Sequence, residues 1–317
     1  MKAKPPTRRI NWSAYLFILP AFLILGVFHI YPVFYAIYTS LNKGAINKFQ
    51  FIGLTNYTRA LSSSDFWQSL GTTFTYTLLT IPFTILFGLF FAYLLFNVRK
   101  GKGVYRSIYF LPYVISTVGS AVVWAVIFDP SSGFANQVLN ALGIPPLRWL
   151  IEPSGLFEAL SGTHGGIAGP PVALIAVAIF TIWQTMGYDV IIFMAGLTGI
   201  PHELYEAARI DGAGSFALFR YITLPLLSPT TFFVIVISVI GSLQSFNQIY
   251  AMNTAAAQRL GGPLGATNTL TVYMFDQLYS FSNYGYASAI AVLLSLIILA
   301  LTLLNFRFLG RRAGEAS

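Results

Sequence analysis

The sequence has no cysteine and few charges. The absence of cysteine from its 317 residues excludes disulfide bonds, thiolate metal sites and cysteine nucleophiles. Only 9% of the residues are charged, whereas ordinary soluble domains carry about 25%. With 56% hydrophobic residues and a mean hydropathy of +0.70, the composition excludes an ordinary water-soluble domain and indicates a chain whose natural solvent is the lipid bilayer.

Nucleotide-binding and metal-binding patterns are missing as well. The only text near a phosphate-binding loop, Gly-Lys-Gly at residues 101–103, lacks the spacing and the hydroxyl that such a loop requires. The chain therefore does not bind ATP by that means. The three histidines, at positions 29, 164 and 202, are scattered and match no metal-ligand pattern, so we expect no catalytic or metal site in this chain.

Six long apolar stretches make up most of the chain, each close to or above the roughly 20 residues that a membrane-spanning helix needs. Only helices and closed barrels satisfy backbone hydrogen bonds in lipid, and the stretches show no period-2 alternation. The sequence therefore predicts an all-α integral membrane protein with six transmembrane helices. The first stretch is longer than a signal-peptide core, and we expect a retained helix with kinks at Pro20, Gly26 and Pro32. The stretches cover roughly residues 13–41, 70–98, 105–128, 172–197, 225–250 and 286–309.

The distribution of basic residues predicts the orientation. Lys and Arg near span ends stay on the cytoplasmic side, and one face of the predicted topology has 13 of them against 5 on the other. Both termini are therefore expected to be cytoplasmic. The same bias accounts for the net charge of +8, so the charge does not indicate nucleic-acid binding. The richer face carries Lys2, Lys4, Arg8, Arg9, Arg99, Lys100, Lys102, Arg106, Arg209, Arg220, Arg307, Arg311 and Arg312.

The long loop at residues 129–171 lies on the opposite face. A loop of more than about 15 residues is usually functional, self-structured or disordered. Residues 134–142 within it are predicted to form a short helix near the membrane surface.

A charged segment that contains glycine, here called the island, separates the fourth and fifth apolar stretches and covers residues 201–224. Pro201 suits the first turn of a helix because it has no amide hydrogen and its φ is already helical. Glu203 is favoured near the positive N-terminal end. The helix is predicted to end at Asp211-Gly212, because glycine adopts the left-handed conformation that often follows a helix.

A second short helix is predicted after this turn. Ser215 is expected to cap it, the helix runs through Arg220, and Pro225 marks the entry into the fifth span. The island is thus predicted to be a helix, a sharp turn and another helix, held in water beside the membrane.

The first of these two helices has a small apolar face. This face consists of Leu204, Ala207 and Ala208, which fall at i, i+3 and i+4. Glu206 and Arg209 lie on the adjacent polar face. Such a slim face suits docking into a partner's groove. An amphipathic loop lying on the lipid headgroups is the alternative.

Seven residues of the island match every position of a longer signature, Glu-Ala-Ala-x3-Gly-x9-Ile-x-Leu-Pro, namely Glu206, Ala207, Ala208, Gly212, Ile222, Leu224 and Pro225. In this signature the chain resembles the permeases of ATP-binding-cassette importers, and most closely the first permease of maltose- or glycerol-phosphate-type carbohydrate importers. The likeness covers most of the chain, including the lead-in at residues 196–201 and the closing segment at 286–310. Segments around 155–171 and 255–262 are longer than the family pattern.

The resemblance implies a set of partners: a second homologous permease in a heterodimer, two ATPase subunits that bind ATP and Mg²⁺, and an extracytoplasmic solute-binding protein. Residues 206–212 would be the coupling helix in a cleft of one ATPase, with Glu206 bonding to the ATPase or its own loop and Gly212 supplying the turn. The chain itself would be a multi-pass transport pore of the bacterial inner membrane, with no enzyme activity or cofactor of its own. Residues 1–317 would form one permease domain with cytoplasmic tails at 1–12 and 310–317.

Polar side chains within the spans suggest a route for solute, because a sugar needs amides to match its hydroxyls and an aromatic plane. If the fifth stretch is one helix, Gln244, Asn247 and Gln248 share a face at i, i+3 and i+4. Gln184 and Tyr188 share a face of the fourth. The alternative is that such groups only hold helices together. A further candidate surface carries Tyr113, Ser116, Thr117 and Ser120.

Asp189 is the only acid within a predicted span. A charge at such depth costs about 2.5 to 3.5 kcal/mol on insertion scales, so Asp189 is either a pathway residue or part of a helix-packing hydrogen bond. A secondary carrier that uses an ion gradient through Asp189 is the rival function. A membrane enzyme or scaffold would need convergent catalytic groups, which the sequence lacks. Glycerol phosphate or another polar solute stays open, although the absence of basic residues from the span interiors favours a neutral mono- or oligosaccharide.

Overall fold

The computed structural model describes residues 12–44, 48–98, 100–162 and 169–308. The predicted tails at 1–12 and 310–317 lie outside these residues, apart from Trp12. Within the described residues the chain is mostly helical, and its one small sheet pairs β1 (Asn42–Lys43) with β2 (Gln50–Phe51) in antiparallel register. The all-α class is therefore confirmed for the part of the chain that the structure describes.

Four helical segments are long and apolar enough to cross a membrane. They correspond to the first, second, fourth and sixth predicted spans. The first is continuous through a π turn, η1 (Gly26–Ile30), which comes just before Pro32, where the missing amide hydrogen removes one helical bond. The segments are α1 (Trp12–Leu25) with η1 and α2 (Tyr31–Ser40), then α4 (Ser64–Asn97), α9 (Val172–Thr198) and α16 (Tyr284–Phe308).

The third and fifth predicted spans are broken. Helix α5 (Lys102–Val114) meets α6 (Thr117–Ile127) at 91°, and the segment Ser215–Leu226 meets α13 (Ser228–Leu243) at 63°. The number of spans in the described residues is six only if each bent pair counts as one. Ser116 ends the extended break in the third span and accepts a hydrogen bond from the Gly119 amide at 3.4 Å.

The fifth span also ends earlier than predicted. The expectation of one helix over residues 225–250 is wrong, because α13 stops at Leu243 and a new helix, α14 (Asn247–Ala255), starts after Phe246. The backbone carbonyl of Ser245, released from the helix, accepts a 2.6 Å hydrogen bond from the Thr271 hydroxyl. A side chain from another segment thus satisfies the backbone group that the break exposes, as lipid-embedded structure requires.

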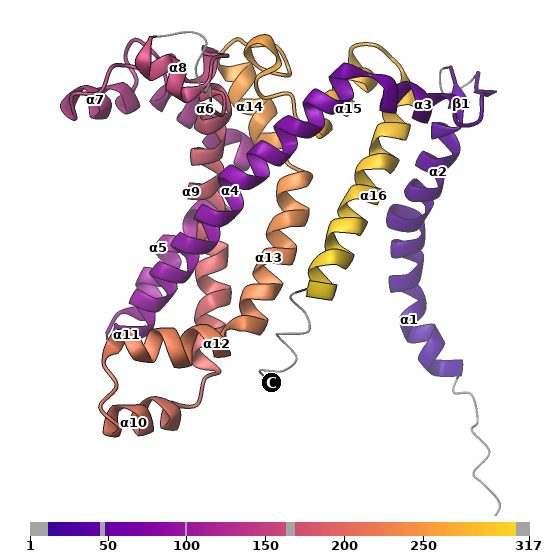
Figure 1. The fold of residues 1–317 in the computed structure, drawn as a ribbon. Helices are drawn as coiled ribbons and strands as arrows, with labels where there is room; N and C mark the ends of the chain where they lie inside the picture. Colours follow the sequence, from indigo (N-terminus) through magenta and orange to yellow (C-terminus); the bar gives the residue numbers. More distant parts are fainter. Residues whose placement is uncertain (1–11, 45–47, 99, 163–168, 309–317) are drawn as a thin grey trace, which may run out of the picture.

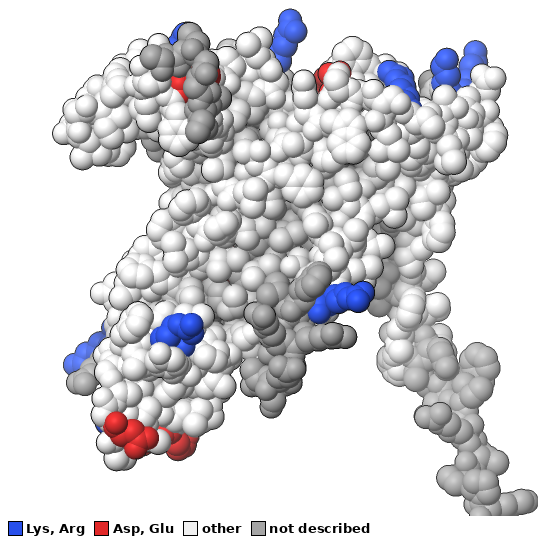
Figure 2. All heavy atoms as spheres, viewed as in Figure 1, with Lys and Arg blue, Asp and Glu red and all other residues white. Residues whose placement is uncertain are grey.

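Figure 1 shows the connecting segments gathered at two opposite ends. At one end, the α7 end, lie α3 (Thr55–Ser62), α7 (Phe134–Ala141), α8 (Leu156–Ser161), α14 and α15 (Leu270–Tyr279). At the other, the α10 end, lie α10 (His202–Ile210), α11 (Ser215–Leu218) and α12 (Leu224–Leu226), with the described ends of α1 and α16. The short helix predicted at 134–142 is confirmed. In Figure 2 the visible charges lie toward these ends, with an uncharged band between them.

The loop that follows α6 is fixed by Asp129. The Ser131 hydroxyl, together with the amide and hydroxyl of Ser132, donates to the Asp129 carboxylate at 2.6 to 3.0 Å. These hydrogen bonds stabilise the charged form and lower the pKa of Asp129 to about 2.

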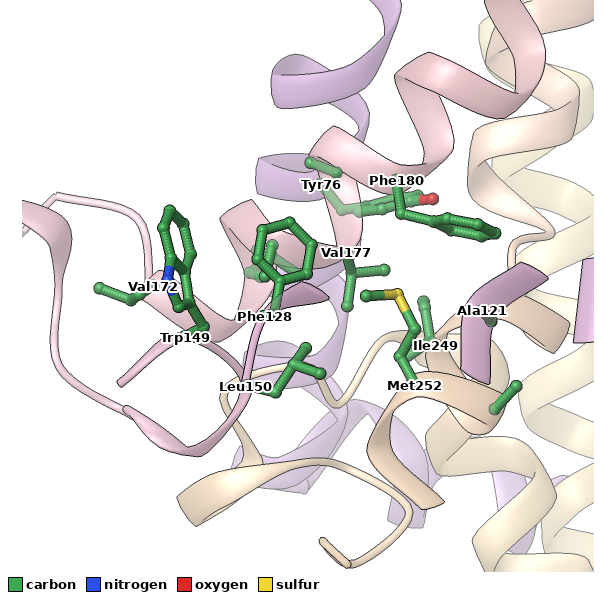
Figure 3. Close-up of a cluster of buried hydrophobic side chains, with 14 of the residues drawn as sticks. Tyr76, Ala121, Phe128, Trp149, Leu150, Val172, Val177, Phe180, Ile249 and Met252 are labelled. Carbon is green, nitrogen blue, oxygen red and sulfur yellow. The ribbon is translucent and has the colours of Figure 1, made fainter. Parts of the chain in front are cut away.

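Two buried clusters hold the bundle together. Near the α7 end, α4, the end of α6, the short turn η2 (Trp149–Ile151), α9 and α14 are joined by Tyr76, Phe128, Trp149, Phe180 and Met252 (Figure 3). The α10-end cluster, defined by its buried members, links α9 to α10, α11 and α13 and comprises Ala92, Leu95, Val190, Phe193, Met194, Leu197, Ile200, Tyr205, Leu218, Leu227 and Val234. The segments that carry the candidate site residues are therefore packed on the same central helix, α9.

Close packing between α5 and α9 depends on Gly187, since a Cβ there would overlap the backbone oxygen of Tyr109. We expect Gly187→Ala to destabilise the protein by about 1–3 kcal/mol, as overpacking does, measured as a lower unfolding temperature in detergent. Gly71→Ala in α4 is the matched control, because nothing lies within 4 Å of the added methyl. Equal melting temperatures for both variants would contradict the contact.

Candidate functional site

The signature loop forms the helix that the sequence predicts. Helix α10 begins at His202, and Glu203 lies in its first turn. Pro201 is the N-cap with extended ψ, so its predicted place in the first turn is one residue early. The helix ends at Ile210, and Gly212, two residues further on, has a φ of +86°. The Ala213 amide donates to the Ala208 carbonyl at 2.9 Å, and the Gly212 amide to the Arg209 carbonyl at 3.0 Å. This pair of bonds is the Schellman motif, so the glycine stop is confirmed.

Tyr205 attaches α10 to the bundle. Its side chain is buried in the α10-end cluster, and its hydroxyl lies 3.0 Å from Thr223 Oγ1. The Thr223 hydroxyl in turn lies 3.3 Å from the Leu218 carbonyl, which can accept from it. The sequence reasoning missed Tyr205, although its place at i−3 from the small Ala208 is a usable signal of a shared inward face.

The opposite face of α10 is free of the bundle. Glu206 is 63% exposed and its only recorded partner among the described residues is His202 on the same helix, with Nδ1 and Oε1 3.1 Å apart. Ala207 and Ile210 are exposed beside it. Acidic side chains gather at this tip of the molecule in Figure 2. A slim, partly acidic helical face thus projects from the α10 end.

Two details of the predicted loop need correction. Ala208 does not share one exposed face with Leu204 and Ala207, because it is half-buried against the α10-end cluster. Ser215 does not cap the second helix: Gly214 is the N-cap, and Ser215 is already helical.

The last three signature residues sit where the chain turns back to the bundle. Ile222 is half-buried against the same cluster, and Leu224 and Pro225 are exposed. The helix continues through Pro225 to Leu226 and bends at Leu227, so the span proper begins at Ser228. The expectation that Pro225 marks the entry is therefore three residues early.

A cavity of about 510 Å³ lies midway along α4 and α9. Side chains of α4, α5, α6, α9, α13 and α14 line this central cavity. Five residues predicted for the solute route line it together: Gln184, Tyr188, Asp189, Asn247 and Gln248. Tyr113 and Thr117 from the further candidate surface also do so.

Hydrogen bonds and one ring stack position these groups. Gln184 Nε2 donates to Thr117 Oγ1 at 2.9 Å, and Gln248 Nε2 donates to the Tyr76 hydroxyl at 3.0 Å. The rings of Tyr113 and Tyr188 stack with centroids 4.9 Å apart. Asn247 is exposed to the cavity and has no recorded side-chain partner among the described residues. The cavity therefore offers a free amide, oriented amides and an aromatic surface.

Gln244 is not part of this cavity. The predicted stripe of three amides is wrong, because the helix break after Leu243 turns Gln244 away from Asn247 and Gln248. Gln244 instead lines a separate cavity of about 350 Å³ with Phe246, Met274 and other mostly apolar residues.

The sequence reasoning also missed the threonines of α4. Thr80 and Thr84 line the central cavity. With Thr73 and Thr77 they recur every three or four residues, which is the helical period and a signal that the sequence offers.

Asp189 is buried at the wall of the central cavity, with 4% of its surface exposed. Its side chain packs against Gly88 of α4, where a Cβ would come within 2.6 Å of the Asp189 Cβ. Within the described residues it has no ion pair and no hydrogen bond. The helix-packing hydrogen bond considered from the sequence is therefore not formed there.

Known proteins resemble the chain along its length. The family model described as binding-protein-dependent transport system inner membrane component matches residues 57–314. The trehalose/maltose transport system permease protein MalF of Thermococcus litoralis is 34% identical over 295 residues, 92% of each chain. The arabinooligosaccharides transport system permease protein AraP of Bacillus subtilis is 31% identical over 309 residues, 96% of this chain and 90% of that protein.

A solved structure shares the fold. A chain in the crystal structure of a bacterial alginate ABC transporter in complex with an alginate pentasaccharide-bound periplasmic protein superposes with a TM-score of 0.77 at 21% identity, over 96% of both chains. Since the family model covers more than half of the sequence and two relatives exceed 30% identity over nearly all of it, the chain belongs to the family of binding-protein-dependent transport system inner membrane components.

Proposed function

We propose that this chain is the permease subunit of an ATP-driven importer that carries a mono- or oligosaccharide across the bacterial inner membrane. The observation that carries the proposal is the exposed face of α10, a signature helix that packs on the bundle through Tyr205 but is not covered on its outer side. The names of the relatives, which are sugar transport system permeases, support the solute class. The N- and C-termini and α10 would face the cytoplasm, where the basic residues concentrate.

The proposed assembly places the energy source outside this chain. A second homologous permease would complete a heterodimer, two ATPase subunits would bind ATP and Mg²⁺, and an extracytoplasmic solute-binding protein would deliver the sugar. The α10 face with Glu206 and Ala207 would sit in a cleft of one ATPase subunit, a case of helix-in-groove recognition.

The route from α10 to the pore runs through packed side chains. Tyr205 and the Schellman turn at Gly212 fix α10 to the α10-end cluster, which contains Leu197 of α9 and Leu227 at the bend before α13. Both α9 and α13 line the central cavity. A displacement of α10 by the ATPase would therefore move the walls of the cavity, since packed interiors transmit strain.

The central cavity suits a neutral sugar. Its lining includes amides, hydroxyls and the Tyr113–Tyr188 stack, and its lining residues include no Lys, Arg or His. Amides and hydroxyls match sugar hydroxyls, and aromatic rings cover apolar sugar faces. An anionic solute such as glycerol phosphate would lack a counter-charge there. In this proposal Asp189 lines the path of the solute through the central cavity.

The unpaired Asp189 supports one alternative function, that of a carrier energised by an ion gradient. That carrier would accumulate sugar when this chain alone is reconstituted in liposomes under a proton gradient. The importer requires the ATPase subunits and ATP.

Gly212 tests the rigidity of the coupling turn. Gly212→Ala puts a side chain at φ +86°, which costs about 1–2 kcal/mol, so we expect solute-stimulated ATP hydrolysis by the assembled transporter to fall about 5- to 30-fold while the protein still inserts. Gly212→Asn should recover part of the activity, because asparagine tolerates this conformation.

Gly214→Ala is the control for Gly212. Its φ is −75° and nothing lies within 4 Å of the added methyl, so hydrolysis should stay near the wild-type rate. The turn has no coupling role if both alanine variants hydrolyse ATP equally fast.

Asn247 and Gln244 form a matched pair for the solute route. Both are exposed amides next to the same helix break, but only Asn247 lines the central cavity. Loss of one hydrogen bond worth about 1 kcal/mol should raise the half-saturating sugar concentration about fivefold in Asn247→Ala and leave it unchanged in Gln244→Ala. The measurement is uptake of labelled maltose, trehalose and an arabino-oligosaccharide by the full transporter in proteoliposomes. The opposite ranking would place the route elsewhere.

A further inference from the structure

A second cavity of about 510 Å³, here named the basal cavity, lies at the α10 end between the ends of two spans and the coupling loop. Its walls come from the end of α4, the start of α5, and the helices α10 and α11. Lys102, Arg209 and His202 line it, and no Asp or Glu is among its lining residues. The described cavity wall thus has only basic ionisable side chains apart from tyrosines.

Three residues of α10 line the basal cavity, and the Glu206 carboxylate lies beside them, with its Oε1 3.1 Å from His202 Nδ1. His202, Tyr205 and Arg209 fall at i, i+3 and i+7, so they share one helical face, and all three line the basal cavity. Glu206 is 63% exposed and does not line it. Arg209 makes no ion pair within the described residues. Its guanidinium has no hydrogen-bond partner there either, so within that part of the chain its five donors are available for a ligand.

Lys102 is held in place at the other wall. Its Nζ donates to the backbone oxygen of Phe96 at 2.8 Å, in the last turn of α4, and lies 5.5 Å from the centre of the Phe96 ring. An ammonium group has three donors, so two remain available. The hydroxyl of Ser215 at the start of α11 adds a neutral donor.

The basal cavity is also partly apolar and lies where spans end. Phe96 and Leu218 form part of its wall, and α4 and α5 meet there. On the adjoining α11 and η3 (Phe219–Thr223), Phe216 and Tyr221 are 79% and 75% exposed. Aromatic side chains with this exposure are typical of the membrane interface. Basic pockets between spans on the cytoplasmic side suit lipid headgroups.

We propose that the basal cavity binds a phosphate-bearing anion, with Lys102 and Arg209 as its counter-charges. The phosphate can come from the headgroup of an anionic phospholipid or from a free phosphate compound in the cytoplasm. Bound there, it bridges α10 to the junction of α4 and α5, and so ties the coupling helix to the membrane domain. This inference goes beyond the import of sugar, and its test reads binding rather than transport.

The test uses the purified full-length chain and native mass spectrometry. In one arm the chain is titrated with phosphatidylglycerol, and with phosphatidylcholine of the same acyl chains as the zwitterionic control. In the other arm inorganic phosphate is the ligand, with chloride at equal ionic strength as its control. Saturable binding is expected for phosphatidylglycerol or for phosphate. The arm in which it appears identifies the source.

The variants assign the site. Removing both counter-charges in the double variant Lys102→Gln, Arg209→Gln should weaken binding about 25-fold, at roughly a factor of five for each basic residue. The double variant Arg106→Gln, Arg220→Gln loses the same charge from exposed positions that do not line the cavity, and should bind almost as the wild type does.

A third variant guards against a folding defect. Ser215→Glu keeps both basic residues and places a carboxylate at the cavity wall, so it should also weaken binding of the phosphate group. The proposal is overturned if neither ligand binds more tightly than its control, or if the cavity variants and the Arg106, Arg220 variant lose affinity equally.

Discussion

The contact between the buried Tyr205 hydroxyl and Thr223, 3.0 Å apart, is the constraint on which the account of this protein depends. The proposed coupling role requires that α10 be exposed on one side and attached to the bundle on the other. Tyr205 attaches α10 to the segment that leads into α13. The Schellman turn at Gly212 then fixes the direction in which the chain returns. The outward face is left free for a partner.

Breaks in the spans are the second organising feature. Backbone groups freed within lipid must find partners in the protein, and the structure provides them, as Thr271 does for the Ser245 carbonyl. Two of the breaks adjoin the central cavity, since Thr117 starts α6 and Asn247 starts α14. Irregular backbone at such depth is tolerated where it lines a cavity, so the same interruptions that shorten the helices create a polar surface in the bundle.

The sequence predicted the segments whose signals are local. Apolar length located the long helices α4, α9 and α16, and Pro201 and Gly212 bounded α10, because these cues act within one or two turns. Gln184 and Tyr188 line the same cavity, as their predicted shared face implies, because α9 is an unbroken helix and spacing along the chain translates directly into a shared face.

The failures share one cause. Gln244 was grouped with Asn247 and Gln248 by assuming a continuous helix, and the break that separates them is stabilised by Thr271, 26 residues beyond Ser245. The inward turn of Ala208 and the anchoring role of Tyr205 likewise depend on contacts with distant segments. Helical periodicity shows which residues of one stretch share a face, but contacts with distant segments decide which neighbouring helix covers that face.

The most direct measurement of the central claim uses the absence of cysteine from the chain. A single Ala207→Cys, labelled with a maleimide photo-crosslinker in native membranes, places a probe on the free face of α10, and Tyr279→Cys places the same probe at the opposite, α7 end. If α10 is the coupling helix, illumination links the Ala207 position to an ATPase subunit and the Tyr279 position to none. The coupling role of α10 is contradicted if the probe at Ala207 crosslinks only to lipid. It is contradicted also if an ATPase subunit is captured only by the probe at Tyr279, or by neither probe.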